Sequence, residues 1–159
     1  MNTLDSLKST PVRDVMTREV VSAMADDSIR ELAQLMAENE LSAVPVVNHK
    51  NECIGMISRS DLTEMFLEED QVFSNLLDAD LMSVAWLSQS TESGTLRQVK
   101  ELMQGEVVTI DADEGLGWAC QLMIKHQIHH LPVTDEDRQL RGILSTFDIV
   151  KWVGQETGA

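Results

Sequence analysis

The feature that most constrains this chain is an internal repeat. When the sequence is aligned with itself at an offset of 87 positions, residues 12–66 lie on residues 99–153 without a gap, and 15 of the 55 aligned positions are identical. This similarity indicates two copies of one unit. Because a solenoid needs at least about three repeats, two copies indicate one compact pair with pseudo-two-fold symmetry.

Each copy shows the same order of local patterns. In the first copy, the apolar residues from Ile29 to Met36 recur at helical spacing, and Asp26, Asp27 and Ser28 offer caps for the start of that helix. Pro45 indicates an edge strand or the start of a strand ladder. In the first copy, the pattern predicts strands over 19–23, 43–47 and 53–57 and helices over 28–39 and from 58 onward. In the second copy, it predicts strands near 106–110, 130–134 and 140–144 and helices near 115–126 and 146–153.

These patterns predict an α+β fold, close to α/β, built from two βαββα units. A unit of about 55 residues buries too little surface to be stable alone, so we expect the two units to pack sheet to sheet. The predicted boundaries are 1–66 for the first unit with an N-terminal segment, 67–98 for a linker and 99–159 for the second unit with a C-terminal tail. The first half of the linker is predicted to be helical and the second half to be a loop.

Charge and hydropathy narrow the classes of function. The net charge of −15 repels phosphate backbones and anionic lipid surfaces, which argues against nucleic-acid binding and membrane binding. No apolar run reaches the length of about 20 residues that a membrane helix needs, and the first ten residues lack the apolar stretch of a secretion signal. We therefore expect a cytoplasmic protein without membrane insertion, in which Cys53 and Cys120 are buried thiols.

One motif ends a strand and starts a helix in both copies. It runs from Gly55 to Asp61 and again from Gly142 to Asp148, as glycine, two apolar residues, serine, two variable residues and aspartate. Ser-x-x-Asp at a helix start resembles a capping box, in which the serine and the acid satisfy free backbone N–H groups. The motif is therefore open to two interpretations, a helix cap and a ligand site.

The ordered set of motifs resembles the CBS-domain family. Members of that family carry the G-h-h-[ST]-x-x-D motif, where h is apolar, an apolar-Pro-[VI] strand ten residues earlier, and an opening V-x-x-[VL]-M segment, matched here by 12–16 and 99–103. The resemblance covers about two-thirds of the chain. It implies a tandem CBS pair, also called a Bateman module, that acts as a regulatory, non-catalytic sensor of AMP, ADP or ATP. The nucleotide would bind in clefts between the two CBS units, and magnesium could accompany ATP.

The resemblance also implies the residues that bind. The aspartate of the motif would hold the ribose hydroxyls and the serine would lie beside the ribose-phosphate, which gives Asp61 with Ser58 and Asp148 with Ser145. A carboxylate suits two vicinal hydroxyl donors, and a helix N-terminus suits a phosphate. His129 occupies the position of a basic residue that reaches the phosphate in some members, whereas the first copy has Ser42 there. Adenine would lie along the backbone of the segments that contain Val21, Ser22, Thr109, Ile110 and Asp111.

Other functions remain open at this point. His126, His129 and His130 could be ordinary strand-end residues or zinc ligands, but no further ligand completes a zinc set, so no metal and no cofactor is expected. No catalytic motif is present, so no enzyme is expected. Two alternatives to nucleotide sensing are a ligand-free scaffold for protein interaction and a binder of S-adenosylmethionine or another adenosyl ligand.

The expected partners follow from the same features. A sensor of this kind would act on an effector protein that the sequence does not identify. A homodimer is expected through apolar residues of the last helix of each copy, namely Leu62, Met65, Phe66, Ile149, Trp152 and Val153.

Overall fold

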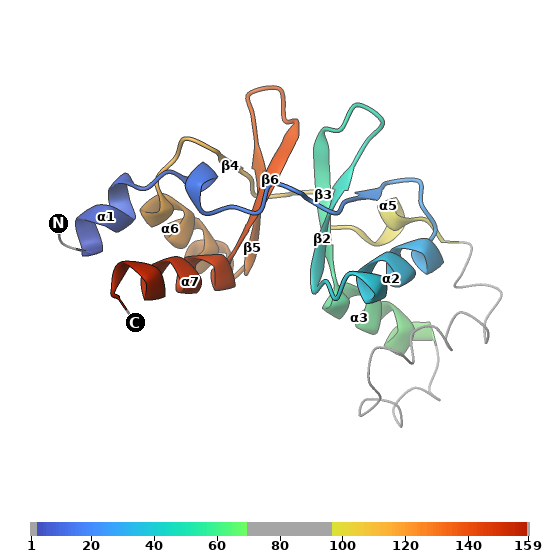
Figure 1. The fold of residues 1–159 in the computed structure, drawn as a ribbon. Coiled ribbons are helices and arrows are strands. Elements are labelled where there is room, and N and C mark those ends of the chain that lie inside the picture. The colour runs from blue at the N-terminus through green and yellow to red at the C-terminus, as the bar shows by residue number, and fades with distance from the viewer. Residues whose placement is uncertain (1–2, 70–96, 159) are drawn as a thin grey trace. The chain divides into compact units, whose positions relative to one another are not determined.

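The chain forms two compact units, each with its own sheet and helices (Figure 1). The computed structural model describes residues 3–69 and 97–158. Unit 1 contains residues 1–20, 50–53 and 108–159, and unit 2 contains residues 21–49 and 54–107. The predicted mixed α and β architecture of two similar units is confirmed, whereas most of the predicted linker lies outside the described residues.

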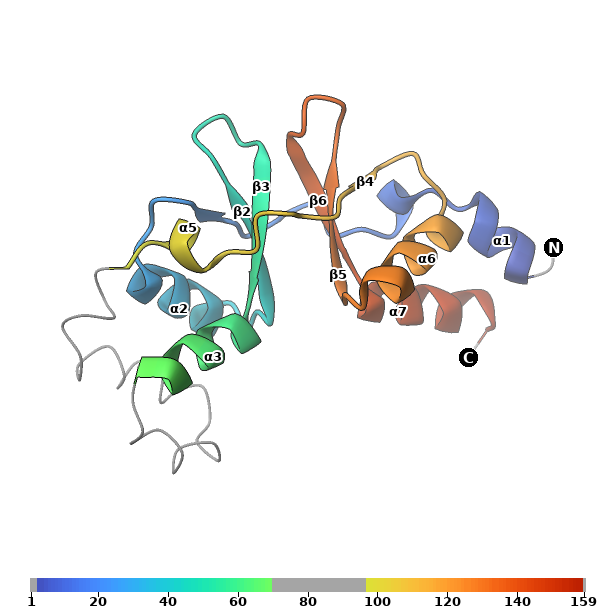
Figure 2. The same cartoon turned by 180° about the vertical axis from the view of Figure 1, so that it is seen from behind.

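Unit 2 is built mainly from the first repeat. A three-stranded sheet in the order β1-β2-β3 is covered on one face by two helices, as Figure 2 shows from behind. The strands are β1 (Ala23–Met24), β2 (Ala43–Val47) and β3 (Cys53–Ser58), and the helices are α2 (Ile29–Glu38), α3 (Arg59–Glu69) and the short α5 (Val99–Leu102).

Unit 1 repeats this arrangement with the second copy. Its sheet has the order β4-β5-β6, and α1 lies beside α6 in both views (Figures 1 and 2). The strands are β4 (Ile110–Asp111), β5 (His130–Thr134) and β6 (Leu140–Ser145), and the helices are α1 (Thr3–Ser9), a 3-10 turn η1 (Val12–Asp14), α6 (Leu116–His126) and α7 (Thr146–Glu156).

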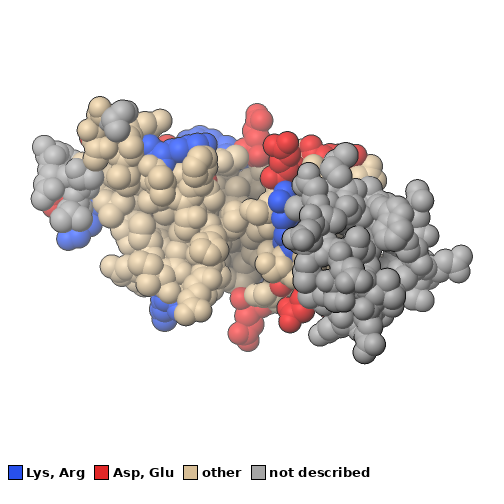
Figure 3. Space-filling model, turned by 90° about the horizontal axis from the view of Figure 1, so that it is seen from below, with Lys and Arg blue, Asp and Glu red and all other residues tan. Residues whose placement is uncertain are grey.

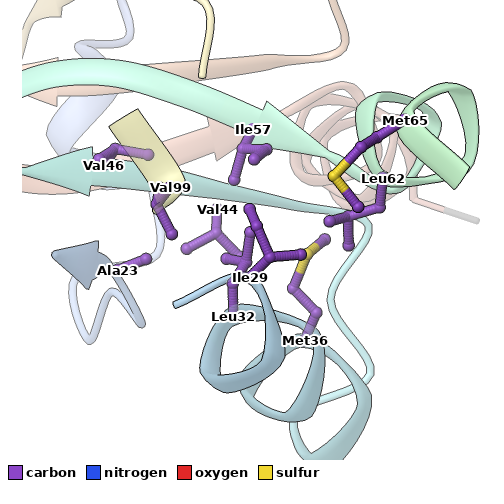
Figure 4. Packing of buried hydrophobic residues seen from close by; sticks show 10 residues of the cluster. All are labelled: Ala23, Ile29, Leu32, Met36, Val44, Val46, Ile57, Leu62, Met65 and Val99. Atoms are coloured by element: carbon purple, nitrogen blue, oxygen red, sulfur yellow. The ribbon is translucent and has the colours of Figure 1, made fainter. Parts of the chain in front are cut away.

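The opening segment of each repeat belongs to the unit that carries the other repeat's strands. In unit 1 the amide of Val12 donates to the carbonyl of Glu114 at 2.8 Å, and in unit 2 the amide of Val99 donates to the carbonyl of Asp27 at 2.9 Å. Both valines are fully buried. Val99 lies among core residues of the first repeat in Figure 4. We call residues 12–20 and 99–107 the exchanged segments, and they make the compact units a different division of the chain from the repeats.

The motif glycines receive these exchanged segments. A Cβ on Gly55 would lie 2.8 Å from Sδ of Met103, and a Cβ on Gly142 would lie against Sδ of Met16. Gly55 and Met103 belong to unit 2, and Gly142 and Met16 belong to unit 1. The motif glycine of each copy therefore packs against the methionine in the opening segment of the other copy.

The first strand of each copy is shorter and later than predicted. Strands were expected over 19–23 and near 106–110, but β1 begins only at Ala23 and β4 only at Ile110. Each first strand pairs through two residues, and in unit 2 these are Ala23 with Val46 and Met24 with Val47. The other predicted strands and helices are confirmed to within about three residues.

Proline lies in a central strand of each sheet, so the prediction of an edge strand was wrong. Pro132 directly precedes the residues of β5 that pair with β4, namely Val133 and Thr134. The missing N–H of Pro132 therefore removes no hydrogen bond between β5 and β4. The alternative prediction, that the proline marks the start of a ladder, agrees with this position.

Several residues predicted to form a surface patch are core residues instead. Leu62 and Met65 point into the core of unit 2, where Figure 4 shows them close to Met36. Trp152 is likewise in the core of unit 1, because it lies on the sheet-facing side of α7. The exposed apolar side chains of α7 are Phe147, Val150 and Val153.

The surface around this helix carries little charge. In Figure 3 the face of unit 1 on the side of α7 shows few Lys, Arg, Asp or Glu side chains. The ammonium of Lys151 covers the Phe147 ring at 4.5 Å from its centroid, a cation–π contact. Of the two thiols predicted to be buried, Cys53 is buried, but Cys120 is only partly so.

Candidate functional site

The motif of the second repeat lies where β6 ends and α7 begins. Ser145 is the N-cap of α7, and its Oγ accepts from the amide of Asp148 at 3.1 Å. In return, Oδ2 of Asp148 accepts from the amide of Ser145 at 2.8 Å and from its hydroxyl at 2.6 Å. The capping box that the sequence predicted as one interpretation is therefore present.

The motif of the first repeat has the same geometry at the junction of β3 and α3. Oδ2 of Asp61 accepts from the amide and from the hydroxyl of Ser58, each at 2.6 Å. The amide of Asp61 donates to Oγ of Ser58 at 3.4 Å, a longer contact than its counterpart in unit 1. Each helix start is thus fixed by its own serine and aspartate.

A helix cap does not exclude a ligand here, because the cap uses only one carboxylate oxygen. Oδ2 of each aspartate is taken by the serine, whereas Oδ1 differs between the units. Oδ1 of Asp61 accepts from Nε2 of Gln104 at 3.1 Å. Within the described residues, Oδ1 of Asp148 accepts no hydrogen bond. Both aspartates are half-buried, so a hydroxyl from solvent can reach them.

The histidines lie beside the Asp148 motif. His130 starts β5 directly opposite Ser145 in the antiparallel ladder, and the amide of Thr146 donates to the carbonyl of His129 at 2.9 Å. Burial and then repulsion from His129 lower the pKa of His130, while the negative charge of Asp148 opposes this. His129 is exposed, and its predicted role at a phosphate stays a prediction.

The Asp61 motif has a different neighbour. Ser42 stands at the position of His129, and its carbonyl accepts from the amide of Arg59 at 3.0 Å. The guanidinium of Arg59 donates through Nε to the carbonyl of Leu41 at 2.7 Å. Each motif therefore has a cationic or titratable side chain nearby, but from different positions of the repeat.

The segments expected to border adenine precede or form the first strand of each sheet. Val21 and Ser22 are half-buried before β1, and Thr109 is half-buried before β4. Because Ile110 pairs with Val133, the register of β4 and β5 directs Thr109 toward the end of the sheet where Ser145 lies.

The side chains of Ile110 and Asp111 are engaged in different ways. The side chain of Ile110 is in the core with 4 % exposure. Oδ1 of Asp111 accepts from the amide of Asp113 at 2.8 Å, which forms a local turn. The predicted contact of Ile110 with adenine could use only its main-chain groups, and the contacts of both residues with adenine stay a prediction.

Among the described side chains, no three His, Cys, Asp or Glu gather closely enough to hold a metal ion. None of the helices in residues 3–69 and 97–158 combines the length and the apolar character that crossing a bilayer requires.

Comparison with known proteins identifies the repeat. The sequence model of the CBS domain matches residues 12–68 and again residues 99–155. The uncharacterized protein MJ1426 of Methanocaldococcus jannaschii is 23% identical over 150 residues, which cover 88% of this chain and 89% of that protein. Four other curated relatives are longer, and the matches span between 32% and 63% of their lengths.

Solved structures share the fold. The structure of CBSX2 in complex with AMP matches with a TM-score of 0.72 and 22% identity, covering 92% of this chain and 98% of that one. The CBS domain pair of MJ0100, in complex with 5'-methylthioadenosine and S-adenosyl-L-methionine, matches with a TM-score of 0.70, 22% identity and the same coverage.

Proposed function

Since this chain belongs to the CBS domain family, we propose that it is a regulatory, non-catalytic module that senses an adenosine ligand. The observation that carries the proposal is the carboxylate of Asp148. Its Oδ2 is held by the cap, which fixes the orientation of the group, and its Oδ1 accepts no hydrogen bond within the described residues. A fixed, half-buried carboxylate is suited to accept the vicinal hydroxyls of a ribose.

The proposed roles follow the repeat. Asp148 and Asp61 accept the ribose hydroxyls, and the helix starts at Ser145 and Ser58 face the phosphate side. His129 supplies positive charge to a phosphate when it is protonated. Backbone groups in the segments before β1 and β4 border the adenine. A ligand cleft formed by the two CBS repeats, which the family resemblance implies, is part of this proposal.

Among nucleotides, we propose AMP or ADP as the preferred ligand. The chain carries a net charge of −15, so each further phosphate is repelled more strongly. ATP should bind more weakly than AMP unless magnesium neutralises part of its charge. The same electrostatic argument supports a second candidate, S-adenosylmethionine, because its sulfonium is cationic and it offers the same ribose hydroxyls.

A thermal-shift series separates these possibilities. A ligand at one hundred times its Kd stabilises the folded state by about 2.7 kcal/mol. For a chain of this length that raises Tm by roughly 5–11 °C. The series compares AMP, ADP, ATP with and without magnesium, S-adenosylmethionine, 5'-methylthioadenosine and GMP, with GMP as the control for the base.

The outcomes are distinct. Shifts with adenylates but not with GMP support nucleotide sensing, and a shift with the adenosyl sulfur compounds alone supports the second candidate. No shift with any compound at millimolar concentration would refute ligand sensing and leave a protein-interaction scaffold. In either case we propose that the module acts on an effector protein, whether joined to it or separate, in the cytoplasm.

A further inference from the structure

Gln104 belongs to the exchanged segment of unit 2 and lies beside Asp61. Its amide donates to the carbonyl of Met56 at 3.1 Å and its carbonyl accepts from the amide of Met56 at 3.3 Å, which fixes its backbone on β3. From this position its side-chain Nε2 donates to Oδ1 of Asp61 at 3.1 Å. Since Ser58 occupies Oδ2, both oxygens of this carboxylate are engaged within the protein.

The equivalent residue of unit 1 is Thr17. Its backbone is fixed in the same way, with both hydrogen bonds to Ile143 at 2.9 Å. In the part of the chain that the structure describes, no hydrogen bond joins the Thr17 hydroxyl to Asp148. The neighbours of the two motifs differ in several ways, and the difference that touches the carboxylate itself is the amide donor on Oδ1.

We propose that Gln104 makes the two adenosine sites unequal, so that the Asp148 motif binds more tightly and the Asp61 motif accepts both ribose hydroxyls only when the ligand displaces the glutamine. This inference rests on the proposed function. A vicinal ribose diol brings two donors to the carboxylate. At Asp61 the amide and hydroxyl of Ser58 fill Oδ2, and the Gln104 amide takes one of the two acceptor positions of Oδ1. The second ribose hydroxyl must therefore displace the glutamine, and the lost protein hydrogen bond is subtracted from the binding free energy. At Asp148 the hydroxyl has no such competitor.

Calorimetric titration of the full chain tests this with AMP and 5'-methylthioadenosine as probes, because both carry the ribose hydroxyls. In an Asp148→Ala background, the Asp61 motif is measured alone, and Gln104→Met removes the donor while keeping the length of the side chain. We expect Gln104→Met to tighten binding by about threefold to tenfold, the effect of one partly exposed hydrogen bond.

The matched reverse change is Thr17→Gln in an Asp61→Ala background. It places an amide opposite Asp148 and should weaken binding by a similar factor. If an alanine background unfolds, Asp148→Asn or Asp61→Asn replaces it, since the amide oxygen can still accept the cap. Circular dichroism of each variant checks that the fold is retained.

The results separate this inference from the function on which it rests. If neither probe binds any variant or the wild type, both the proposed function and the inference fail. If the probes bind but Gln104→Met leaves the affinity of the Asp61 motif unchanged or lowers it, the inference alone fails. Tighter binding by Gln104→Met together with weaker binding by Thr17→Gln establishes it.

Discussion

Replacing Gly142 with alanine tests the exchange of segments directly. The added Cβ would meet Sδ of Met16 and would lie 3.1 Å from the carbonyl oxygen of Thr17. The Met16 side chain can rotate, but the carbonyl of Thr17 is held by the amide of Ile143 at 2.9 Å and can give only a few tenths of an ångström. Overpacking of this kind costs about 1–3 kcal/mol, so Tm should fall by about 2–12 °C.

A second substitution should restore part of this loss. Met16→Ala removes the sulfur that the new Cβ meets, so the double variant should be more stable than the sum of the single changes predicts, by about 0.5–3 kcal/mol. The same Met16→Ala change should be additive with Gly55→Ala, because Gly55 contacts Met103 instead. Equilibrium unfolding in urea of the single and double variants gives these coupling energies.

The control is Gly154→Ala in α7, where an added Cβ meets nothing within 4 Å. Helix propensity alone should then stabilise the protein by about 0.5–1 kcal/mol. If Met16→Ala rescues Gly55→Ala and not Gly142→Ala, each opening segment packs on its own repeat. The composition of the two units given above would then be incorrect.

Three further predictions follow from the described contacts. Ser145→Ala removes the side-chain cap of α7 and should lower the free energy of unfolding by about 0.5–2 kcal/mol in urea, while Thr157→Ala at the other helix end should change it much less. Because the pKa of His130 is lowered in the folded state, the unfolded chain binds more protons than the folded chain as pH falls through the ordinary value of 6.5. The free energy of unfolding should therefore decrease as pH falls from about 7.5 to 5.5, and His130→Gln should reduce this pH dependence in thermal unfolding. An equal pH dependence in wild type and variant would contradict the lowered pKa of His130. The wild type should form a homodimer by light scattering and Val150→Glu a monomer, because Val150 lies on the exposed apolar side of α7; a monomeric wild type at tens of micromolar would exclude this interface.

Much of the local structure could be predicted from the sequence. Strand β2 was bounded correctly because continuous apolar residues lie between polar turns, and β5 because it aligns with β2 in the repeat. Strands β1 and β4 were not, because the β-branched run at Val20 and Val21 indicates extended chain and does not reveal where a neighbouring strand begins to pair.

The exchange of opening segments could not be predicted from one sequence. Both copies carry the same Val and Met positions and the same glycine, so packing within a copy and packing between copies satisfy the pattern equally well. Only the three-dimensional path of the chain after Val20 and after Val107 decides between them.

The candidate site shows the same division. The spacing of serine and aspartate predicted a helix cap, which is confirmed in both repeats. The ligand-site interpretation of the same spacing stays a prediction, with which the cap is compatible because it uses one carboxylate oxygen. The contact from Gln104 to Asp61 was missed because it joins residues 43 positions apart in sequence. The difference between glutamine and threonine at equivalent repeat positions was the available signal.

The exchange of segments has a consequence for how this protein can be divided. A chain cut between Glu69 and Arg97 yields two fragments, and each compact unit needs residues from both of them. Such halves should reassemble when they are expressed together, as a split protein does, and either half alone should lack a buried valine of its core. Although the chain consists of two similar repeats, neither repeat is a complete folding module, so a gene that lost one copy would encode no intact unit.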